Sequence, residues 1–329
     1  MVTTWPKNFP GLGTGANLLA EKITQMTAGR IKVTIYGAGE LVPAMEVFDA
    51  VSNGTAQMGH SAAYYWKGKS EAVQFFTSVP FGLTANEMAA WFYYGGGLEL
   101  WHEVYKPFNL VAFPAGNTGV QMGGWFNKEI NSIDDLKGLK MRIPGLGGEV
   151  LKRLGGTPVT LPGGEIFTSL QSGAIDATEW VGPYNDLAFG LYKAAKYYYY
   201  PGWHETGSTL ECMINKEAFE ALPDDLQNLV KDACRIVNED MFAEYNARNG
   251  KALKELVNKH GVQLKKFPDA VLKKLVTVSD EVIAEVAKKD DLSKRVYESF
   301  KAFREDSAAN VDVSERAYLN ARALVKEKS

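Results

Sequence analysis

Arg142 is the residue whose type and position most favour binding of an anion. It lies in a short apolar run between Met141 and Ile143, and side chains alternate in direction along a strand. Arg142 is therefore expected to point away from these neighbours and out of the apolar layer. A guanidinium is always charged, and its planar fork pairs bidentately with a carboxylate. The spacing alone favours an ordinary surface or ion-paired arginine, and a carboxylate-binding arginine is the alternative that its chemistry allows.

Other residue types that carry chemistry give weaker patterns. The histidines are His60, His102, His204 and His260. None stands at metal-ligand spacing from another histidine or from a cysteine, so a structural or surface role is expected for each. His204 is the exception to watch, because it adjoins Glu205.

The segment Gly11–Ala16 loosely resembles a dinucleotide-binding fingerprint between a strand and a helix. Alanine fills the third glycine position and Pro10 stands just before the segment. A glycine-rich turn whose amides face an interlobe space is therefore the favoured interpretation. The sequence also has no phosphate-loop lysine pattern and no Gly-x-Ser-x-Gly elbow, which disfavours these enzyme classes.

The elements that would position Arg142 alternate between strands and helices. In the first third, apolar spacing predicts a helix over Ala16–Met26, a strand over Ile31–Tyr36, a helix after Pro43 and a strand over Gln57–Ala63. Later strands are expected over Leu110–Pro114, Val120–Phe126, Leu139–Ile143, Pro158–Leu161 and Ile175–Val181, and helices over Ile133–Leu136, Gly148–Leu154 and Ile166–Gln171. This alternation implies a mainly parallel sheet covered on both faces. The run Tyr197–Tyr200 is a buried aromatic strand or helix end, and from about Lys216 the composition predicts a mostly helical, charged tail.

Length and composition limit the class of protein. A chain of 329 residues is too long for one ordinary core, so two α/β lobes are expected. The net charge is −3, so basic residues are not in excess over acidic ones. This disfavours nucleic acid and anionic membranes as partners. No apolar run is long enough to span a bilayer. No signal peptide precedes the first strand, so the protein is either cytosolic or separated from its export signal. Cys212 and Cys234 either pair in an oxidising compartment or are small buried apolar residues.

Several segments together resemble the extracytoplasmic solute-binding proteins of TRAP transporters, and the resemblance covers nearly the whole chain. They are the opening Thr-Thr-Trp strand, Val79–Leu83, Gly138–Gly145 and Leu170–Asp176. The resemblance implies that Arg142 grips the carboxylate of a solute. It also implies a two-lobed α/β fold like that of periplasmic binding proteins, with a ligand cleft between the lobes and a helical C-terminal tail. One lobe would comprise residues 1–117 and about 207–250, the other residues 118–206, and the C-terminal helices about 251–329.

Three further segments are similar to the subgroup of this family that binds 2-oxo acids, or lactate, with a metal ion. They are Gly119–Phe126, Ile175–Pro183 and Pro201–Glu205. The subgroup implies that Glu179 and Glu205 are carboxylate ligands of the metal. It implies that Gln121 offers its side-chain carbonyl to the metal and its amide to the solute. Trp180 would give the metal its backbone carbonyl and place its indole against the solute. Oxygen-only ligation favours sodium or calcium over zinc.

The residues alone leave other interpretations of these roles open. Glu179 and Glu205 lie far apart in the sequence and could be two solvated acids, and Gln121 could cap a backbone group. The cleft candidates of the first lobe are Tyr64 and Tyr65, with Asn117 and Phe81 as weaker ones. For the tyrosines, a place in the aromatic core is the alternative.

Trp180 stands where relatives that bind sialic acid or C4-dicarboxylates often carry asparagine. Tryptophan makes the pocket smaller and more apolar, which favours a small monocarboxylate whose 2-oxo or 2-hydroxy oxygen helps to chelate the ion. The resemblance thus implies a periplasmic or extracytoplasmic receptor, not an enzyme, that delivers an acid such as pyruvate or lactate to TRAP membrane subunits. A metal-dependent enzyme acting on 2-oxo acids is the alternative, but no poised base or nucleophile stands out beside Arg142. Relatives also suggest a homodimer through the C-terminal helix, although a monomer whose tail packs across both lobes fits the sequence equally well.

Overall fold

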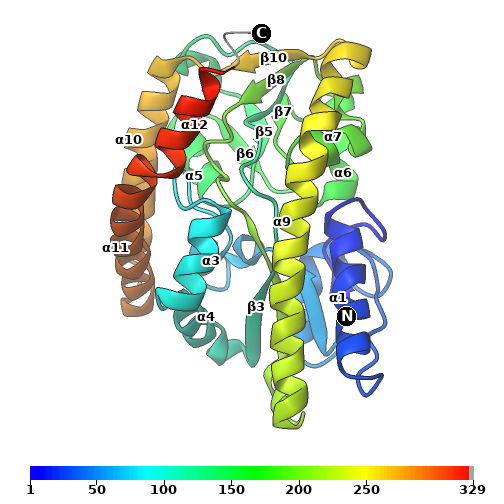
Figure 1. Ribbon diagram of the computed structural model, residues 1–329. Coiled ribbons are helices and arrows are strands. Elements are labelled where there is room, and N and C mark those ends of the chain that lie inside the picture. The colour runs from blue at the N-terminus through cyan, green and yellow to red at the C-terminus, as the bar shows by residue number, and fades with distance from the viewer. Residues whose placement is uncertain (326–329) are drawn as a thin grey trace.

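The computed structural model describes residues 1–325 and contains two separate β-sheets flanked by helices (Figure 1). The first sheet has the order β1 (Val2–Thr3), β2 (Met58–Ser61), β9 (Thr209–Asn215) and β3 (Leu110–Asn117). The second has the order β10 (Gln263–Lys266), β8 (Tyr197–Tyr200), β4 (Gly124–Phe126), β7 (Ala177–Thr178), β5 (Lys140–Arg142) and β6 (Thr157–Val159). Each sheet with its helices forms one half of the molecule, as expected for two α/β lobes.

Helices cover both sheets and form most of the last third of the described chain. The α-helices are α1 (Leu12–Met26), α2 (Val47–Ser52), α3 (Ala85–Tyr94), α4 (Gly97–Tyr105), α5 (Gly145–Arg153), α6 (Gly163–Gln171), α7 (Pro183–Phe189), α8 (Lys216–Glu220), α9 (Asp224–His260), α10 (Asp269–Val286), α11 (Asp291–Val313) and α12 (Glu315–Ala323). Short 3₁₀ helices span Ala44–Glu46, Ala63–Trp66, Glu71–Phe76, Lys106–Phe108, Ile133–Leu136 and Leu191–Lys193. The predicted helical tail is confirmed over the described residues, with β10 as an added strand, and residues 326–329 of the tail lie outside them.

The expected strand over Ile31–Tyr36 is wrong, because only Tyr36 pairs with another strand residue, through an isolated bridge to Val2. Side chains do alternate in exposure along this segment. Its neighbour β1 has only two residues and is too short to support a longer ladder. The period of the side chains was therefore predicted correctly, but the hydrogen-bonded ladder does not form.

The expectation of mainly parallel sheets is also wrong, because both sheets are mixed. β9 runs antiparallel to both β2 and β3, and β4 runs antiparallel to both β7 and β8. β9 directly follows β8 of the second sheet along the chain, so the chain returns from the second sheet to the first at this point. Alternation of strands and helices along the sequence does not reveal such a crossing between sheets.

α9 is a single helix of 37 residues that runs along both halves of the molecule (Figure 1). It packs against β3 and α1 of the first half and against α7 of the second. A Cβ added at Gly11 would lie 2.5 Å from the hydroxyl oxygen of Tyr245 in α9, and one at Gly15 would strike Met241. The glycines that resemble a nucleotide fingerprint thus allow close packing of α1 on α9.

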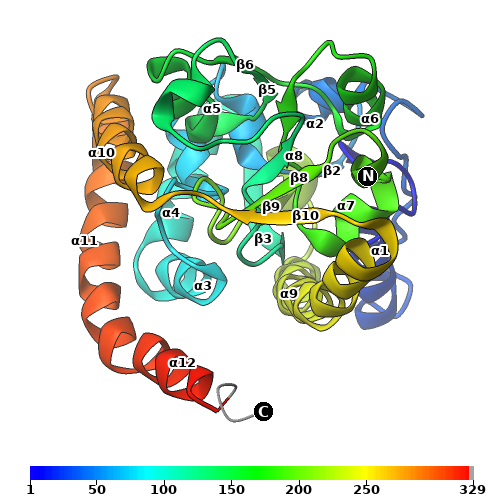
Figure 2. The same ribbon diagram turned by 90° about the horizontal axis from the view of Figure 1, so that it is seen from above.

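The C-terminal helices also contact both halves. α10 packs against α5, whereas α11 packs against α3 and α4, and Figure 2 shows α10 and α11 along one flank of the molecule. Ion pairs Arg153–Glu285 and Arg295–Glu103 join these surfaces. α9 runs continuously past residue 250, where one of the expected boundaries falls. The division of the chain into lobes at the expected residues stays a prediction.

Aromatic side chains fill the core of each half. In the first half, Phe76 stacks on Trp101 at a centroid distance of 5.1 Å, and in the second Trp125 stacks on Tyr198 at 4.0 Å. The run Tyr197–Tyr200 is thus an aromatic strand. Cys212 and Cys234 are free and buried in one apolar cluster of the first half, as expected for small apolar residues.

Candidate functional site

Arg142 ends strand β5 and is fully buried. Its guanidinium forms an ion pair with the carboxylate of Glu179, and donates to the backbone carbonyl of Leu161 at 3.2 Å and to the hydroxyl of Tyr65 at 3.1 Å. Burial lowers the pKa of Arg142, but the neighbouring Glu179, Tyr65, Tyr64 and Glu205 together outweigh it, so this pKa lies above its ordinary value. The interpretation as a surface arginine is excluded. The alternative of an ion-paired arginine agrees with the pairing to Glu179, and the role of Arg142 in binding a solute carboxylate stays a prediction.

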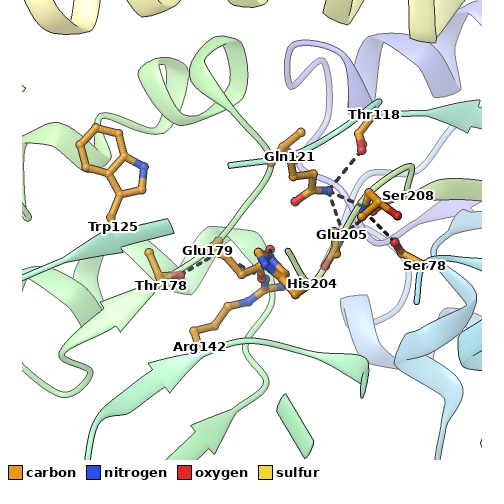
Figure 3. A network of polar contacts seen from close by, with 12 residues as sticks. Ser78, Thr118, Gln121, Trp125, Arg142, Thr178, Glu179, His204, Glu205 and Ser208 are labelled. Carbon is orange, nitrogen blue, oxygen red and sulfur yellow. Dashed lines mark hydrogen bonds and ion pairs between the residues drawn. The ribbon is translucent and has the colours of Figure 1, made fainter. Parts of the chain in front are cut away.

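Two carboxylates and a histidine converge beside this arginine (Figure 3). Glu179 follows β7, and Glu205 lies in the loop between β8 and β9. One ligand atom from each of Glu179, His204 and Glu205 lies within 4.8 Å of the others. His204 Nε2 lies 3.3 Å from Glu179, which identifies it as a donor to that carboxylate. The structure thus brings together two acids that the sequence left far apart.

Glu205 is buried, and its carboxyl group holds a proton more tightly than usual. Burial, together with the neighbouring charge of Glu179, raises the pKa of Glu205 to about 7. Ser208 donates to the same carboxylate at 2.5 Å. Two acids buried so close together repel each other, and a cation placed between them would relieve that repulsion.

The side chain of Gln121 contacts Glu205, one member of this acidic pair (Figure 3). Its amide nitrogen donates to Glu205 at 2.8 Å, to Thr118 at 3.2 Å and to Ser208 at 3.3 Å. Its carbonyl oxygen is buried and has no hydrogen-bond partner among residues 1–325. A buried oxygen without a donor is suited to a cation.

Trp180 places an aromatic face beside the arginine. The guanidinium carbon of Arg142 lies 5.1 Å from the centroid of the Trp180 ring, within cation–π range. The indole N–H of Trp180 is buried and unpaired within the described part of the chain. Trp5 and Phe9 contact the same ring edge-on, at 6.3 and 6.4 Å.

A small cavity is lined by Gln121 and Trp180, but Arg142, Glu179 and Glu205 are not among its lining residues. Its lining consists of Trp5, Leu12, Tyr64, Tyr65, Thr118, Gln121, Trp180, Val181, Ser208 and Leu210. The list contains both tyrosines that the sequence offered as cleft residues. Burial raises the pKa of each of these tyrosines, so both hydroxyls stay protonated and can donate.

The two weaker candidates from the sequence lie outside this cavity lining. Asn117 donates from its side-chain amide to Gly207 and Thr209, and therefore braces the backbone. Phe81 stacks on Trp203 at 6.1 Å. Both residues support the surroundings of the site and do not line the cavity described above.

Sequence reasoning missed several residues of the site. Thr118 and Ser208 hold Gln121 and Glu205 but belong to no recognisable motif. His204 was noticed only because it adjoins Glu205. Trp5 was noticed only as part of the first strand, since nothing in the sequence shows that it meets the second half of the molecule.

The fold and site define a two-lobed solute-binding protein with a buried arginine and an acidic pair between its halves. Residues 1–290 match the family of bacterial extracellular solute-binding proteins, family 7, and the chain belongs to this family. No helix within residues 1–325 is long and apolar enough to cross a membrane. Membership confirms an extracytoplasmic transport protein that binds a solute and is not an enzyme.

Specific relatives of known structure or function are similar over almost the whole chain. A monocarboxylate 2-oxoacid-binding periplasmic protein of Nostoc sp. is 49% identical over 320 residues, which are 97% of this chain and 87% of the relative. A TRAP periplasmic solute-binding protein of Pseudoalteromonas atlantica, solved with sodium and pyruvate, is 45% identical, with a TM-score of 0.94 and coverage of 97% of both chains. A TRAP transporter solute-binding protein of Bordetella bronchiseptica, solved as a mixed-occupancy dimer with calcium and picolinate in one site, is 41% identical. Its TM-score is 0.97, and the match covers 100% of this chain and 98% of the other. The expected two-lobed binding-protein fold is thereby confirmed.

Proposed function

We propose that this protein is the receptor of a TRAP transporter for a small 2-oxo or 2-hydroxy monocarboxylate, which it binds together with sodium or calcium. The observation that carries the proposal is the buried Arg142 beside the Glu179–Glu205 pair. Relatives described as binding 2-oxo acids, or solved with pyruvate and sodium, support the choice of solute and cation.

The side chains present fit a hard cation. The Gln121 carbonyl oxygen lacks a partner among the described residues, and the carboxylates of Glu179 and Glu205 face each other nearby. With the backbone carbonyl of Trp180, these oxygens would hold sodium or calcium, both of which prefer oxygen ligands. His204 donates to Glu179 and would orient that carboxylate toward the ion.

Charge balance supports binding of an anion together with the cation. Arg142 carries one positive charge, and the two glutamates carry two negative charges when ionised. A divalent cation and one solute carboxylate would bring this buried group to neutrality, which a buried site favours. The bidentate fork of Arg142 would fix the solute carboxylate, with Tyr65 as the neighbouring hydroxyl donor.

The transport role requires partners beyond the solute. Family membership implies delivery to TRAP membrane subunits. We also propose a homodimer through the C-terminal helices, supported by exposed apolar side chains on the last described turns. These are Val313, Tyr318, Leu319, Leu324 and Val325. The relative from Bordetella bronchiseptica was solved as a dimer, which supports a dimeric state. Light scattering of the purified protein distinguishes a dimer from a monomer.

Calorimetric titration with pyruvate and lactate tests the proposed function, in sodium, in calcium and with a chelator in sodium-free buffer. Saturable binding that weakens when both cations are removed is expected. Glycerol, which lacks a carboxylate, is the matched negative solute. Absence of binding to every 2-oxo and 2-hydroxy acid would refute the proposed solute class.

A further inference from the structure

Trp5 occupies a wall of the cavity that the roles assigned so far do not explain. It follows β1 in the first half of the molecule and is 2% exposed. Its ring contacts Trp180 of the second half edge-on at 6.3 Å and Tyr65 at 6.3 Å. Tyr65 and Trp180 both contact Arg142, the residue proposed to bind the carboxylate. A single aromatic ring therefore separates Trp5 from Arg142.

A chain of hydrogen bonds fixes the orientation of Trp5. Its indole N–H donates to His60 Nδ1 at 2.8 Å, and His60 Nε2 lies 3.0 Å from the carbonyl oxygen of Ala115. His60 is fully buried, and burial lowers its pKa to about 4, so the ring is neutral. A neutral ring that accepts at Nδ1 must donate at Nε2, and the carbonyl of Ala115 is the acceptor available.

This arrangement determines which surface Trp5 offers to a solute. The only polar group of its side chain, the indole N–H, donates to His60. The Trp5 side chain therefore presents only carbon atoms to the cavity. The neighbouring wall residues Leu12, Val181 and Leu210 are apolar as well. His60 lies on β2, whose pairing with β1 places Thr3 opposite His60. Trp5 is therefore held by the first sheet and is not free to swing aside.

We propose that Trp5, held by His60, sets the upper size limit of the side chain on the bound 2-oxo acid. The inference rests on the proposed function, because it presumes that the carboxylate binds at Arg142. With the carboxylate there, the side chain of the solute extends toward the ring of Trp5. A long or bulky side chain would then meet a fixed aromatic wall, which limits the methyl group of pyruvate least.

The test compares affinities for pyruvate, 4-methyl-2-oxopentanoate and phenylpyruvate in wild-type protein and in Trp5→Phe and Trp5→Ala variants. The quantity of interest is the ratio of each bulky acid's Kd to that of pyruvate. We expect Trp5→Ala to shift this ratio toward the bulky acids by at least about tenfold, since single apolar groups in pockets change affinity by 10- to 200-fold. Trp5→Phe should shift it less, and His60→Leu should shift it in the same direction by releasing the ring.

Trp101→Phe is the matched control, because Trp101 is equally buried in the first half but lies outside the cavity lining. It should leave the ratio unchanged even if it lowers the melting temperature. A ratio within threefold of wild type in both Trp5 variants would overturn the proposal while the proposed function stands. Failure of the wild-type protein to bind any of the three acids would instead refute the proposed function. The Phe variant keeps most of the ring volume and provides the comparison if the Ala variant does not fold.

Discussion

Replacement of Arg142 by alanine should nearly abolish binding of the carboxylate solute. The guanidinium is fully buried, and its loss would leave a solute carboxylate without its charge partner in a site of low dielectric. Removing one member of a buried ion pair costs about 3–5 kcal/mol. A cost of this size corresponds to a loss in affinity of roughly 10²- to more than 10³-fold.

The same substitution affects the protein without solute, because Arg142 also pairs with Glu179. Alanine would leave that glutamate buried beside Glu205, so a loss of stability is expected together with the loss of binding. Arg142→Lys is the informative companion variant. Lysine retains the positive charge but not the fork, and it should recover stability more fully than affinity.

Isothermal titration calorimetry with pyruvate, at fixed calcium concentration, measures the affinity of the three proteins. Urea unfolding of the same samples shows whether each variant is folded under the titration conditions. The reasoning fails if folded Arg142→Ala binds pyruvate within about threefold of wild type. It also fails if Arg142→Lys binds as tightly as wild type, since a point charge would then suffice.

Three further predictions concern the cation, the pH dependence and the backbone of the site. Glu205→Gln should weaken calcium binding at least about tenfold, because it would remove one charged oxygen ligand. Calorimetric titration with calcium alone measures this affinity. An affinity equal to that of wild type would exclude Glu205 as a ligand. Burial raises the pKa of Glu211, which accepts from Trp66 and Tyr105, from 4.5 to about 7. The folded state thus binds this proton more tightly, and the free energy of unfolding should fall by about 3 kcal/mol as pH rises from 4.5 to 7. Glu211→Gln should remove that part of the slope in urea unfolding at several pH values, and an unchanged slope would contradict the assignment. Gly202→Ala should destabilise the protein by about 1–3 kcal/mol and weaken cation binding, because a Cβ at this position would clash with the backbone carbonyl of Gln121. The melting temperature and the calcium affinity of the variant measure these effects. Values equal to those of wild type would show that the backbone shifts to accommodate the Cβ.

The sequence predicts the elements of this protein better than it predicts their pairing. Most helices appear where apolar spacing places them, because that spacing reflects burial against the nearest sheet. Ile31–Tyr36 keeps its alternation but forms no ladder, since a ladder depends on the length of the neighbouring strand. The sequence also does not predict strand direction, because β9 belongs to the first sheet but follows most strands of the second sheet along the chain.

The site shows the same limit at the level of single residues. Arg142 could be selected from its local run, and the resemblance supplied Glu179, Glu205 and Gln121. Whether the two glutamates meet depends on β7 and the loop before β9 lying side by side, which no local pattern encodes. Trp5 is the clearest example, since its contact with Trp180 joins one half of the molecule to the other.

Glu179 lies between the proposed anion-binding and cation-binding parts of the site. Its carboxylate contacts Arg142 on one side and His204 on the other, and Glu205 lies next to it. A cation bound by the glutamates would offset the negative charge that otherwise neutralises Arg142, and so would strengthen the attraction of Arg142 for a solute carboxylate. Two unit charges at about 4 Å interact by roughly 4 kcal/mol at an effective dielectric constant of 20, so this effect is comparable with the binding energy of many solutes.

Coupling between two ligands is reciprocal. The bound solute must therefore raise the affinity for the cation by the same factor by which the bound cation raises the affinity for the solute. A divalent ion supplies twice the charge of sodium at the same position, so the identity of the cation should determine how strongly the two binding events depend on each other.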